Sequence, residues 1–233
     1  MTVQEIVKRV RAAIDEQAQD GTNLAQETTD VQNLTSIIVD KIGYALTHVL
    51  ERAPLDKLDS DAFETYNATQ LEQNFSIDAT TLVGLLKLPS DLLRIIEARL
   101  SSWSHFPTPE SDTSQVYLMQ QDEYARGSWD RPVNIRTHQG SDIVLEMYSA
   151  KTTSDTLNFV FIRKPDASNI SVTNMATTNV DVPKALEAAL VYQVAGLTMV
   201  AFREDIASSL FTIAERNLMG DALRRNAGNS DEE

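Results

Sequence analysis

The sequence contains no cysteine, and its acidic side chains far outnumber its basic ones, with 34 Asp and Glu against 20 Lys and Arg. The absence of cysteine excludes a disulfide framework, thiol redox catalysis, iron–sulfur clusters and cysteine zinc sites. A formal net charge of −14 argues against broad binding to DNA or to an anionic membrane, because phosphate groups attract positive surfaces. No apolar run approaches the roughly 18 residues that span a bilayer, and the N-terminus does not resemble a signal peptide. We therefore expect a soluble, acidic protein that is made in the cytoplasm and has no membrane partner.

Two helices are predicted in the first third of the chain. Apolar residues recur at helical spacing over residues 3–14 and again over residues 31–49. A capping box at Thr2–Glu5 precedes the first helix, and Pro54 ends the second, because proline lacks an amide donor and disfavours helix in the residue before it. The polar residues 17–28 are typical of a loop, so the two helices are expected to pack as a hairpin.

The middle of the chain predicts a small antiparallel sheet of about three to five strands. Runs of β-branched and aromatic residues are typical of strands, and they lie at residues 95–100, 133–138, 143–148 and 157–163. Gln139-Gly140-Ser141 is typical of a hairpin turn between the second and third of these runs. A short helix is expected over residues 115–124.

A single long helix is predicted from Pro183 to Met219 by a continuous apolar stripe. At 1.5 Å per residue it would extend about 55 Å, which exceeds one small core. We therefore expect it to pack partly against another chain or to break, at Gly196 or at the polar group Arg203-Glu204-Asp205.

Helices at both ends and strands between them predict an α+β fold, in which an N-terminal helical hairpin and a long C-terminal helix pack around a small central antiparallel β-sheet. The expected divisions are an N-terminal helical segment (1–74), an antiparallel β-rich region (75–165), a C-terminal long helix that completes the helical bundle (166–227), and a disordered acidic tail (228–233).

Motifs of catalysis and metal binding are missing from the sequence. It contains no Walker loop, no GxGxxG, no GxSxG elbow and no HExxH. The three histidines are far apart, without a partner at helical spacing: His48, His105 and His138. An acidic cluster lacks the glycine and the final glutamate of a calcium loop, and is better explained as a solvated loop: Asp56, Asp59, Asp61 and Glu64. We expect no enzyme activity, no catalytic residues, no cofactor and no metal, although a hydrolase using unidentified carboxylates stays open.

An arginine cluster with a tryptophan marks a candidate interface. Arg126, Arg131 and Arg136 flank Trp129, and arginine with tryptophan is the composition of an interface hot spot. The alternative is that these arginines lie on strand edges and pair with nearby carboxylates: Asp122, Glu123 and Asp130. Arg203 marks a second candidate contact, on the exposed side of the C-terminal helix.

Seven short strings follow one another in order along the middle and the C-terminal part of the chain. The strings are Lys87–Ile95, Ser101–Trp103, Tyr124–Gly127, Arg131–Val133, Leu145–Ser149, Val182–Glu187 and Tyr192–Leu197. They extend over roughly residues 80–215 and are similar to head–tail connector proteins, the neck ring or adaptor, of crAss-like phages of gut Bacteroidales. None of the strings is a catalytic signature.

The resemblance implies a non-enzymatic virion protein of the neck or tail, made in the host cytoplasm. It implies a homo-oligomeric ring, expected to be a dodecamer, that docks on the portal protein and on other neck or tail proteins. Genomic DNA would pass through this ring without sequence-specific binding, which an acidic wall favours because it repels phosphates. Two alternatives stay open: a tail-tube or other minor virion protein, and a cytosolic binding or assembly factor that is absent from the particle.

Overall fold

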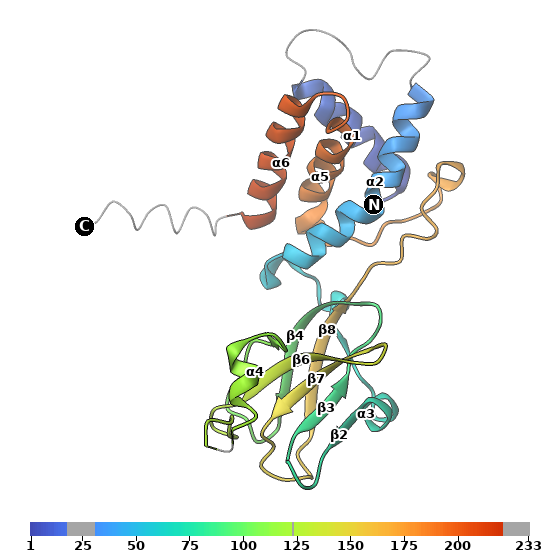
Figure 1. Cartoon of the computed structure of the whole chain (residues 1–233). Coiled ribbons are helices and arrows are strands. Elements are labelled where there is room, and N and C mark those ends of the chain that lie inside the picture. Colours follow the sequence, from blue (N-terminus) through green and yellow to red (C-terminus); the bar gives the residue numbers. More distant parts are fainter. Residues whose placement is uncertain (18–30, 123, 221–233) are drawn as a thin grey trace, which may run out of the picture. The chain divides into compact units, whose positions relative to one another are not determined.

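The computed structural model describes residues 1–17, 31–122 and 124–220, and these residues form two compact units (Figure 1). The helical unit combines Met1–Ser60 with Pro165–Glu233, and the β unit is Asp61–Lys164. Helices and strands are both present and are segregated in the sequence, so the predicted α+β class is confirmed. The expected loop at 17–28, except residue 17, and the expected tail at 228–233 lie outside the described residues.

The first division of the chain lies at Ser60/Asp61 rather than at the expected 74/75. The reason is that residues after Ser60 already belong to the sheets. Strand β1 (Glu64–Thr65) pairs with β8 (Leu157–Arg163), and helix α3 (Ala68–Asn74) leads directly into β2 (Phe75–Ile77).

Four α-helices make up the described part of the helical unit: α1 (Val3–Gln17), α2 (Val31–Arg52), α5 (Glu187–Met199) and α6 (Glu204–Met219). Helix α5 is central, because α1, α2 and α6 all pack against it (Figure 1). Most of its side chains are buried accordingly. Short 3-10 helices lie at Leu55–Lys57, Ser60–Ala62, Val172–Asn174 and Lys184–Leu186.

The first helix begins as the sequence predicts. The Glu5 amide donates to the Thr2 hydroxyl at 3.2 Å, which satisfies one of the amides left without a partner in the first helical turn. The residues that define its apolar stripe are buried: Val3, Ile6, Val7, Val10 and Ile14.

The expected single helix over 183–219 is wrong, because the chain reverses between α5 and α6. Residues 200–203 connect the two helices, which pack against each other over their length. Of the two expected break points, the polar group beginning at Arg203 lies at the reversal, whereas Gly196 lies inside α5. The reversal lets Leu210 and Ala214 of α6 bury against this chain's own core, so no second chain is needed to cover the apolar stripe.

Gly196 has a packing role instead of a hinge role. The Phe211 ring lies over it so closely that a Cβ at Gly196 would be 2.6 Å from Phe211 Cε1. Atoms at that separation clash, so the close approach of α5 and α6 requires glycine at this position.

We predict that Gly196→Ala lowers the free energy of unfolding of the helical unit by about 1–3 kcal/mol through overpacking. In a Phe211→Ala background the same change should be stabilising by up to about 1 kcal/mol, because alanine is the better helix former. Urea unfolding followed by circular dichroism at 222 nm measures both effects. The same sign in both backgrounds would contradict the packing role.

The β unit contains two sheets rather than the single sheet that the sequence predicts. Its described strands are β1 (Glu64–Thr65), β2 (Phe75–Ile77), β3 (Gly84–Lys87), β4 (Leu92–Leu100), β5 (Glu110–Ser111), β6 (Val133–Gln139), β7 (Asp142–Tyr148) and β8 (Leu157–Arg163). The three-stranded sheet has the order β1-β8-β4, and the five-stranded sheet has the order β2-β3-β7-β6-β5. All pairs are antiparallel except β5 with β6, which are parallel.

The predicted hairpin is confirmed. Strands β6 and β7 pair along their whole length, from Val133 opposite Tyr148 to Gln139 opposite Asp142. The two-residue turn between them contains Gly140 with φ +63°, a conformation that glycine adopts without strain.

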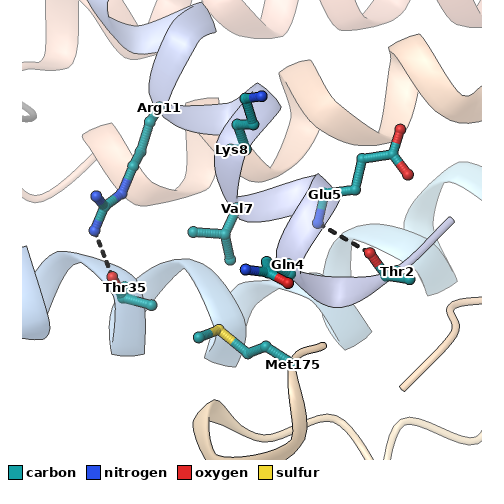
Figure 2. A pocket seen from close by; sticks show the side chains of 8 residues that line it. All are labelled: Thr2, Gln4, Glu5, Val7, Lys8, Arg11, Thr35 and Met175. Atoms are coloured by element: carbon teal, nitrogen blue, oxygen red, sulfur yellow. Dashed lines mark hydrogen bonds between the residues drawn. The ribbon is translucent and has the colours of Figure 1, made fainter. Parts of the chain in front are cut away.

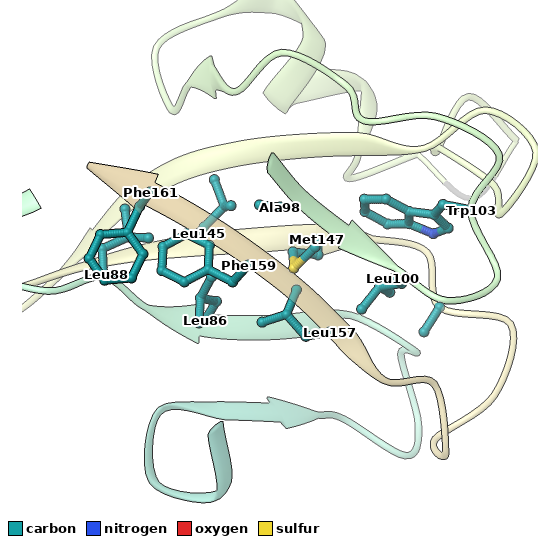
Figure 3. Packing of buried hydrophobic residues seen from close by; sticks show 11 residues of the cluster. Leu86, Leu88, Ala98, Leu100, Trp103, Leu145, Met147, Leu157, Phe159 and Phe161 are labelled. Carbon is teal, nitrogen blue, oxygen red and sulfur yellow. The ribbon is translucent and has the colours of Figure 1, made fainter. Parts of the chain in front are cut away.

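The core of the β unit is built from buried side chains of both sheets (Figure 3). It contains Leu86, Leu88, Ala98, Leu100, Trp103, Leu145, Met147, Ala150, Leu157, Phe159 and Phe161. The rings of Phe159 and Phe161 stack at 4.8 Å between centroids, and the Trp103 indole N–H donates to the Ser149 carbonyl at 3.0 Å. The indole nitrogen is thus buried with a partner, as an aromatic core residue requires.

A buried asparagine joins the two sheets. Asn134 of β6 is fully buried, and its Nδ2 donates to the carbonyl of Ala98 in β4 at 3.2 Å and to that of Pro107 at 3.3 Å. Strands β4 and β6 belong to different sheets and share no backbone hydrogen bonds, so the Asn134 side chain supplies donors to these two carbonyls.

We predict that Asn134→Ala lowers the free energy of unfolding of the β unit by about 1–3 kcal/mol, because both carbonyls lose their donor. Asn158→Ala is the matched control, since Asn158 of β8 is exposed and donates to Glu97; its cost should stay below about 0.5 kcal/mol. Tryptophan fluorescence during urea unfolding measures both, because Trp103 and Trp129 both lie in the β unit. Equal costs would contradict the bridging role.

Candidate interaction surfaces

Exposed apolar side chains gather in two connecting segments. Nine large apolar residues are exposed in the part of the chain that the structure describes: Tyr44, Leu55, Leu118, Met119, Tyr124, Trp129, Val172, Val200 and Phe202. Six of them fall into two groups. We name the first the α4 surface (Leu118, Met119, Tyr124 and Trp129), after helix α4 (Gln115–Met119), and the second the hairpin surface (Val200 and Phe202). Single exposed apolar residues are ordinary, but groups of them within short segments are typical of contact surfaces.

The segment that carries the α4 surface is held by hydrogen bonds. Helix α4 (Gln115–Met119) begins at Ser114, whose hydroxyl accepts from the Tyr117 amide. Beyond the helix, the Gln120 side chain donates to the carbonyl of Val116 at 2.9 Å and accepts from the amide of Gly127 at 2.8 Å. The Gln120 side chain therefore joins the helix to Gly127, near the end of the loop that follows it.

Trp129 lies in a tight turn. The amide of Ser128 donates to the Arg131 carbonyl at 3.1 Å and the amide of Arg131 to the Ser128 carbonyl at 3.0 Å. The Ser128 hydroxyl donates to Asp130 and lowers the pKa of that carboxyl. The Trp129 side chain is 48% exposed, and the Lys151 ammonium lies 4.7 Å from the centre of its ring, a cation–π contact.

Asp155 orders the loop that carries Lys151. Its carboxylate accepts from the amide of Lys151 at 2.8 Å and from the hydroxyl of Ser102. Burial alone would raise the pKa of Asp155, but these bonds and those from Thr152 outweigh it, so the pKa lies below its ordinary value. The ionised carboxylate thus stabilises the loop beside Trp129.

Arg126 points partly inward and fixes the loop to the sheet. Its guanidinium lies 5.3 Å from the centre of the Tyr148 ring, and its Nη2 donates to the Thr81 carbonyl at 2.6 Å. Burial raises the pKa of Tyr148, and the hydrogen bond from its hydroxyl to Glu146 raises it further. The neutral ring is then retained beneath the guanidinium over the ordinary pH range.

The structure brings together only some of the predicted interface residues. Arg126, Trp129 and Arg131 lie in one loop of the β unit, with Arg131 exposed. Arg136 is exposed on β6, beside the short strand β5, and Arg203 belongs to the helical unit.

Sequence reasoning missed three members of the α4 surface, Leu118, Met119 and Tyr124, and it missed Lys151, which lies against Trp129. The expected helix over 115–124 ends at Met119, which leaves Tyr124 in the loop with 97% of its side chain exposed. Nothing in the sequence marks these side chains as exposed, because a short apolar segment is equally compatible with burial.

The hairpin surface lies next to acidic side chains. Val200 and Phe202 are 55% and 56% exposed in the connection between α5 and α6. Arg203 follows and donates to Asp205 from Nε at 3.2 Å and from Nη2 at 3.1 Å, and these hydrogen bonds lower the pKa of Asp205. Glu204 and Asp205, both exposed, form the first turn of α6.

A pocket of about 550 Å³ lies in the helical unit (Figure 2). It is lined by Thr2, Gln4, Glu5, Val7, Lys8, Arg11, Thr35 and Met175. The Thr2 hydroxyl accepts from the Glu5 amide, the Thr35 hydroxyl accepts from Arg11, and the Glu5 carboxylate pairs with Arg9. Its hydroxyls and its carboxylate therefore have structural partners, and none of the described residues that line it is a histidine.

Within residues 1–17, 31–122 and 124–220, no three His, Asp or Glu side chains come together as a metal site. No helix among these residues combines the length and apolar character that crossing a membrane requires. The three histidines stay separate, His48 on α2 in the helical unit, and His105 and His138 in the β unit.

No protein-family model matches the sequence, and no curated protein is significantly similar to it. The function is therefore inferred from the two exposed surfaces, from the net charge of the chain, and from the resemblance of short sequence strings over roughly residues 80–215 to phage connector proteins.

We predict that Asp155→Asn lowers the unfolding midpoint of the β unit at pH 6–7, and that the deficit shrinks as the pH falls below about 4. The folded-state pKa of Asp155 is lowered, so its contribution is present above the unfolded pKa and is lost as the pH falls through the folded value. Ser102→Ala should show the same trend, because it removes one donor to the carboxylate. Tryptophan fluorescence during urea unfolding between pH 2.5 and 7 measures this, and a deficit that is constant with pH would contradict it.

Proposed function

We propose that the protein is a non-enzymatic structural subunit of a virion, a ring-forming head–tail connector between portal and tail that lines a DNA passage. The observation that carries the proposal is the presence of two different exposed surfaces on two different units. The α4 surface belongs to the β unit, and the hairpin surface belongs to the helical unit.

Ring closure requires two different contact surfaces on each subunit. In a heterologous interface each copy presents one patch to the preceding neighbour and another patch to the following neighbour, and the series closes if the rotation between copies permits. An assembly factor that binds one partner needs only one such patch. The presence of two patches therefore favours an assembling subunit.

The net charge supports a passage for DNA. Each copy contributes a formal charge of −14, so a ring of copies produces a strongly negative potential. A negative wall repels the phosphates of a passing duplex and prevents the counterion-driven adhesion that a basic wall would cause. The same charge opposes assembly, so the contacts between copies must supply enough favourable free energy to overcome it.

The placement in the neck is supported by the ordered strings over roughly residues 80–215, which resemble connector proteins of crAss-like phages. On this proposal the partners are further copies of the chain, the portal protein and other neck or tail proteins. A dodecamer is the expected ring, and the DNA makes no sequence-specific contact with it.

We predict that Trp129→Ala weakens assembly by about tenfold or more while it leaves the unfolding midpoint nearly unchanged, because the side chain is half exposed in the monomer. Trp103→Ala is the matched control. The Trp103 indole is buried and hydrogen-bonded, so its loss should lower the free energy of unfolding by about 3–5 kcal/mol. Mass photometry and electron microscopy, with and without purified portal, measure assembly and ring closure.

Two results would contradict the proposal. One is a loss of monomer stability for Trp129→Ala that equals the loss for Trp103→Ala, which would place Trp129 in the core. The other is wild-type protein that forms no closed ring under either condition.

A further inference from the structure

We propose that the α4 surface of one copy binds the hairpin surface of the next copy, with Trp129 of one chain packed against Phe202 of its neighbour. This inference rests on the proposed function and names the partner of each contact surface. The occupant of the α4 surface is thus a second copy of this chain, and the contact is heterologous.

The charges of the chain favour a contact between two different surfaces over a contact between two identical ones. Two copies of the chain, each with a formal net charge of −14, repel one another. A stable contact therefore forms where the local charges of the two faces are opposite. The α4 surface is bordered by two exposed cations, Lys151 over the Trp129 ring and Arg131 in the same turn. Two exposed carboxylates lie there as well, Asp122 in the loop after α4 and Asp130, which accepts from the Ser128 hydroxyl, so the cations and these carboxylates balance, whereas the hairpin surface has two carboxylates for one arginine. The α4 surface is therefore the more positive of the two faces.

The hairpin surface has the complementary character. Phe202 is followed by Arg203 and by two exposed carboxylates, Glu204 and Asp205. Arg203 is bonded to Asp205, which leaves the charge of Glu204 to face an incoming cation. An aromatic residue beside an anion therefore meets an aromatic residue beside a cation.

The aromatic pair provides the apolar part of the contact. Trp129 and Phe202 are each about half exposed, 48% and 56%, so each ring has an uncovered face. Aromatic rings favour offset or edge-to-face packing, and tryptophan is the most frequent anchor of interface hot spots. The bonds of Gln120 already join α4 to Gly127, close to Trp129 in the sequence, which lowers the conformational entropy that binding costs.

The absence of cysteine permits a direct test by cross-linking. Met119→Cys places a thiol on the α4 surface, and Ala201→Cys places one between the two residues of the hairpin surface; both positions are exposed. With a short bismaleimide, the double variant should give a ladder of covalent multimers. A mixture of the two single variants should give only covalent dimers, and each single variant alone should give none.

The matched control combines Met119→Cys with Tyr44→Cys, since Tyr44 is exposed on α2 and belongs to neither surface. This pair should give no ladder. Cross-linking of Met119→Cys to itself would show a symmetric contact and overturn the inference. Assembly without any Met119–Ala201 product would also overturn it while the proposed ring survives, and protein that does not assemble even with the portal would overturn both.

Exchange of charges tests the electrostatic part. Lys151→Glu and Glu204→Lys should each weaken assembly by about tenfold, and the double variant should recover most of this loss because every interface then has the exchanged pair. Lys8→Glu on α1 changes the net charge as much as Lys151→Glu does and should have a much smaller effect. If the double variant instead assembles more weakly than either single variant, the pairing of Lys151 with Glu204 is overturned.

Discussion

Burial of α5 is the constraint on which the rest of the structure depends. Its side chains are covered by α1 and α2 from the beginning of the chain and by α6 from the end. Because both ends of the chain must meet around one helix, residues 61–164 leave the helical unit and return to it, and they form a unit with a core of their own. Each unit carries one of the two exposed surfaces, the α4 surface in the β unit and the hairpin surface in the helical unit.

Local patterns in the sequence predicted α1, α2, α4 and the strands β4, β6, β7 and β8, whereas contacts distant in sequence decided their arrangement. The apolar stripe beginning at Val3 and the β-branched run around Phe159 show their periods within a few residues, and both elements are present in the structure. The stripe over 183–219 does not show where the chain reverses, because the same apolar positions suit one long helix or two antiparallel helices. The packing of Phe211 over Gly196, which holds the two helices together, leaves no periodic signal.

Strands β1 and β5 were not predicted from the sequence, because they too depend on contacts with distant residues. Each has two residues, and β1 exists only because Glu64 and Thr65 pair with β8, almost a hundred residues later. The division of the β unit into two sheets, with Asn134 between them, depends on such pairs as well. The order of the expected helices and strands predicted the class of the fold but not this topology.

The candidate site was predicted in part. Composition was enough to single out Trp129 and Arg131, which are exposed in one turn, but it gave Arg126 the same role, and this side chain instead fixes the loop to Tyr148. Lys151 escaped notice because its contact with Trp129 joins two loops that are 22 positions apart. Exposure is a tertiary property, so a short apolar segment such as 115–119 does not indicate from sequence alone that it faces solvent.

The central claim, that this chain is a structural component of a virion neck, is tested most directly by quantitative peptide mass spectrometry of purified particles alongside lysates of infected cells. The account predicts that the chain is present in particles at a fixed copy number comparable with that of the portal. Detection in infected cells together with absence from particles would contradict it, and an assembly factor that leaves the particle, or an enzyme, would then be the leading alternative.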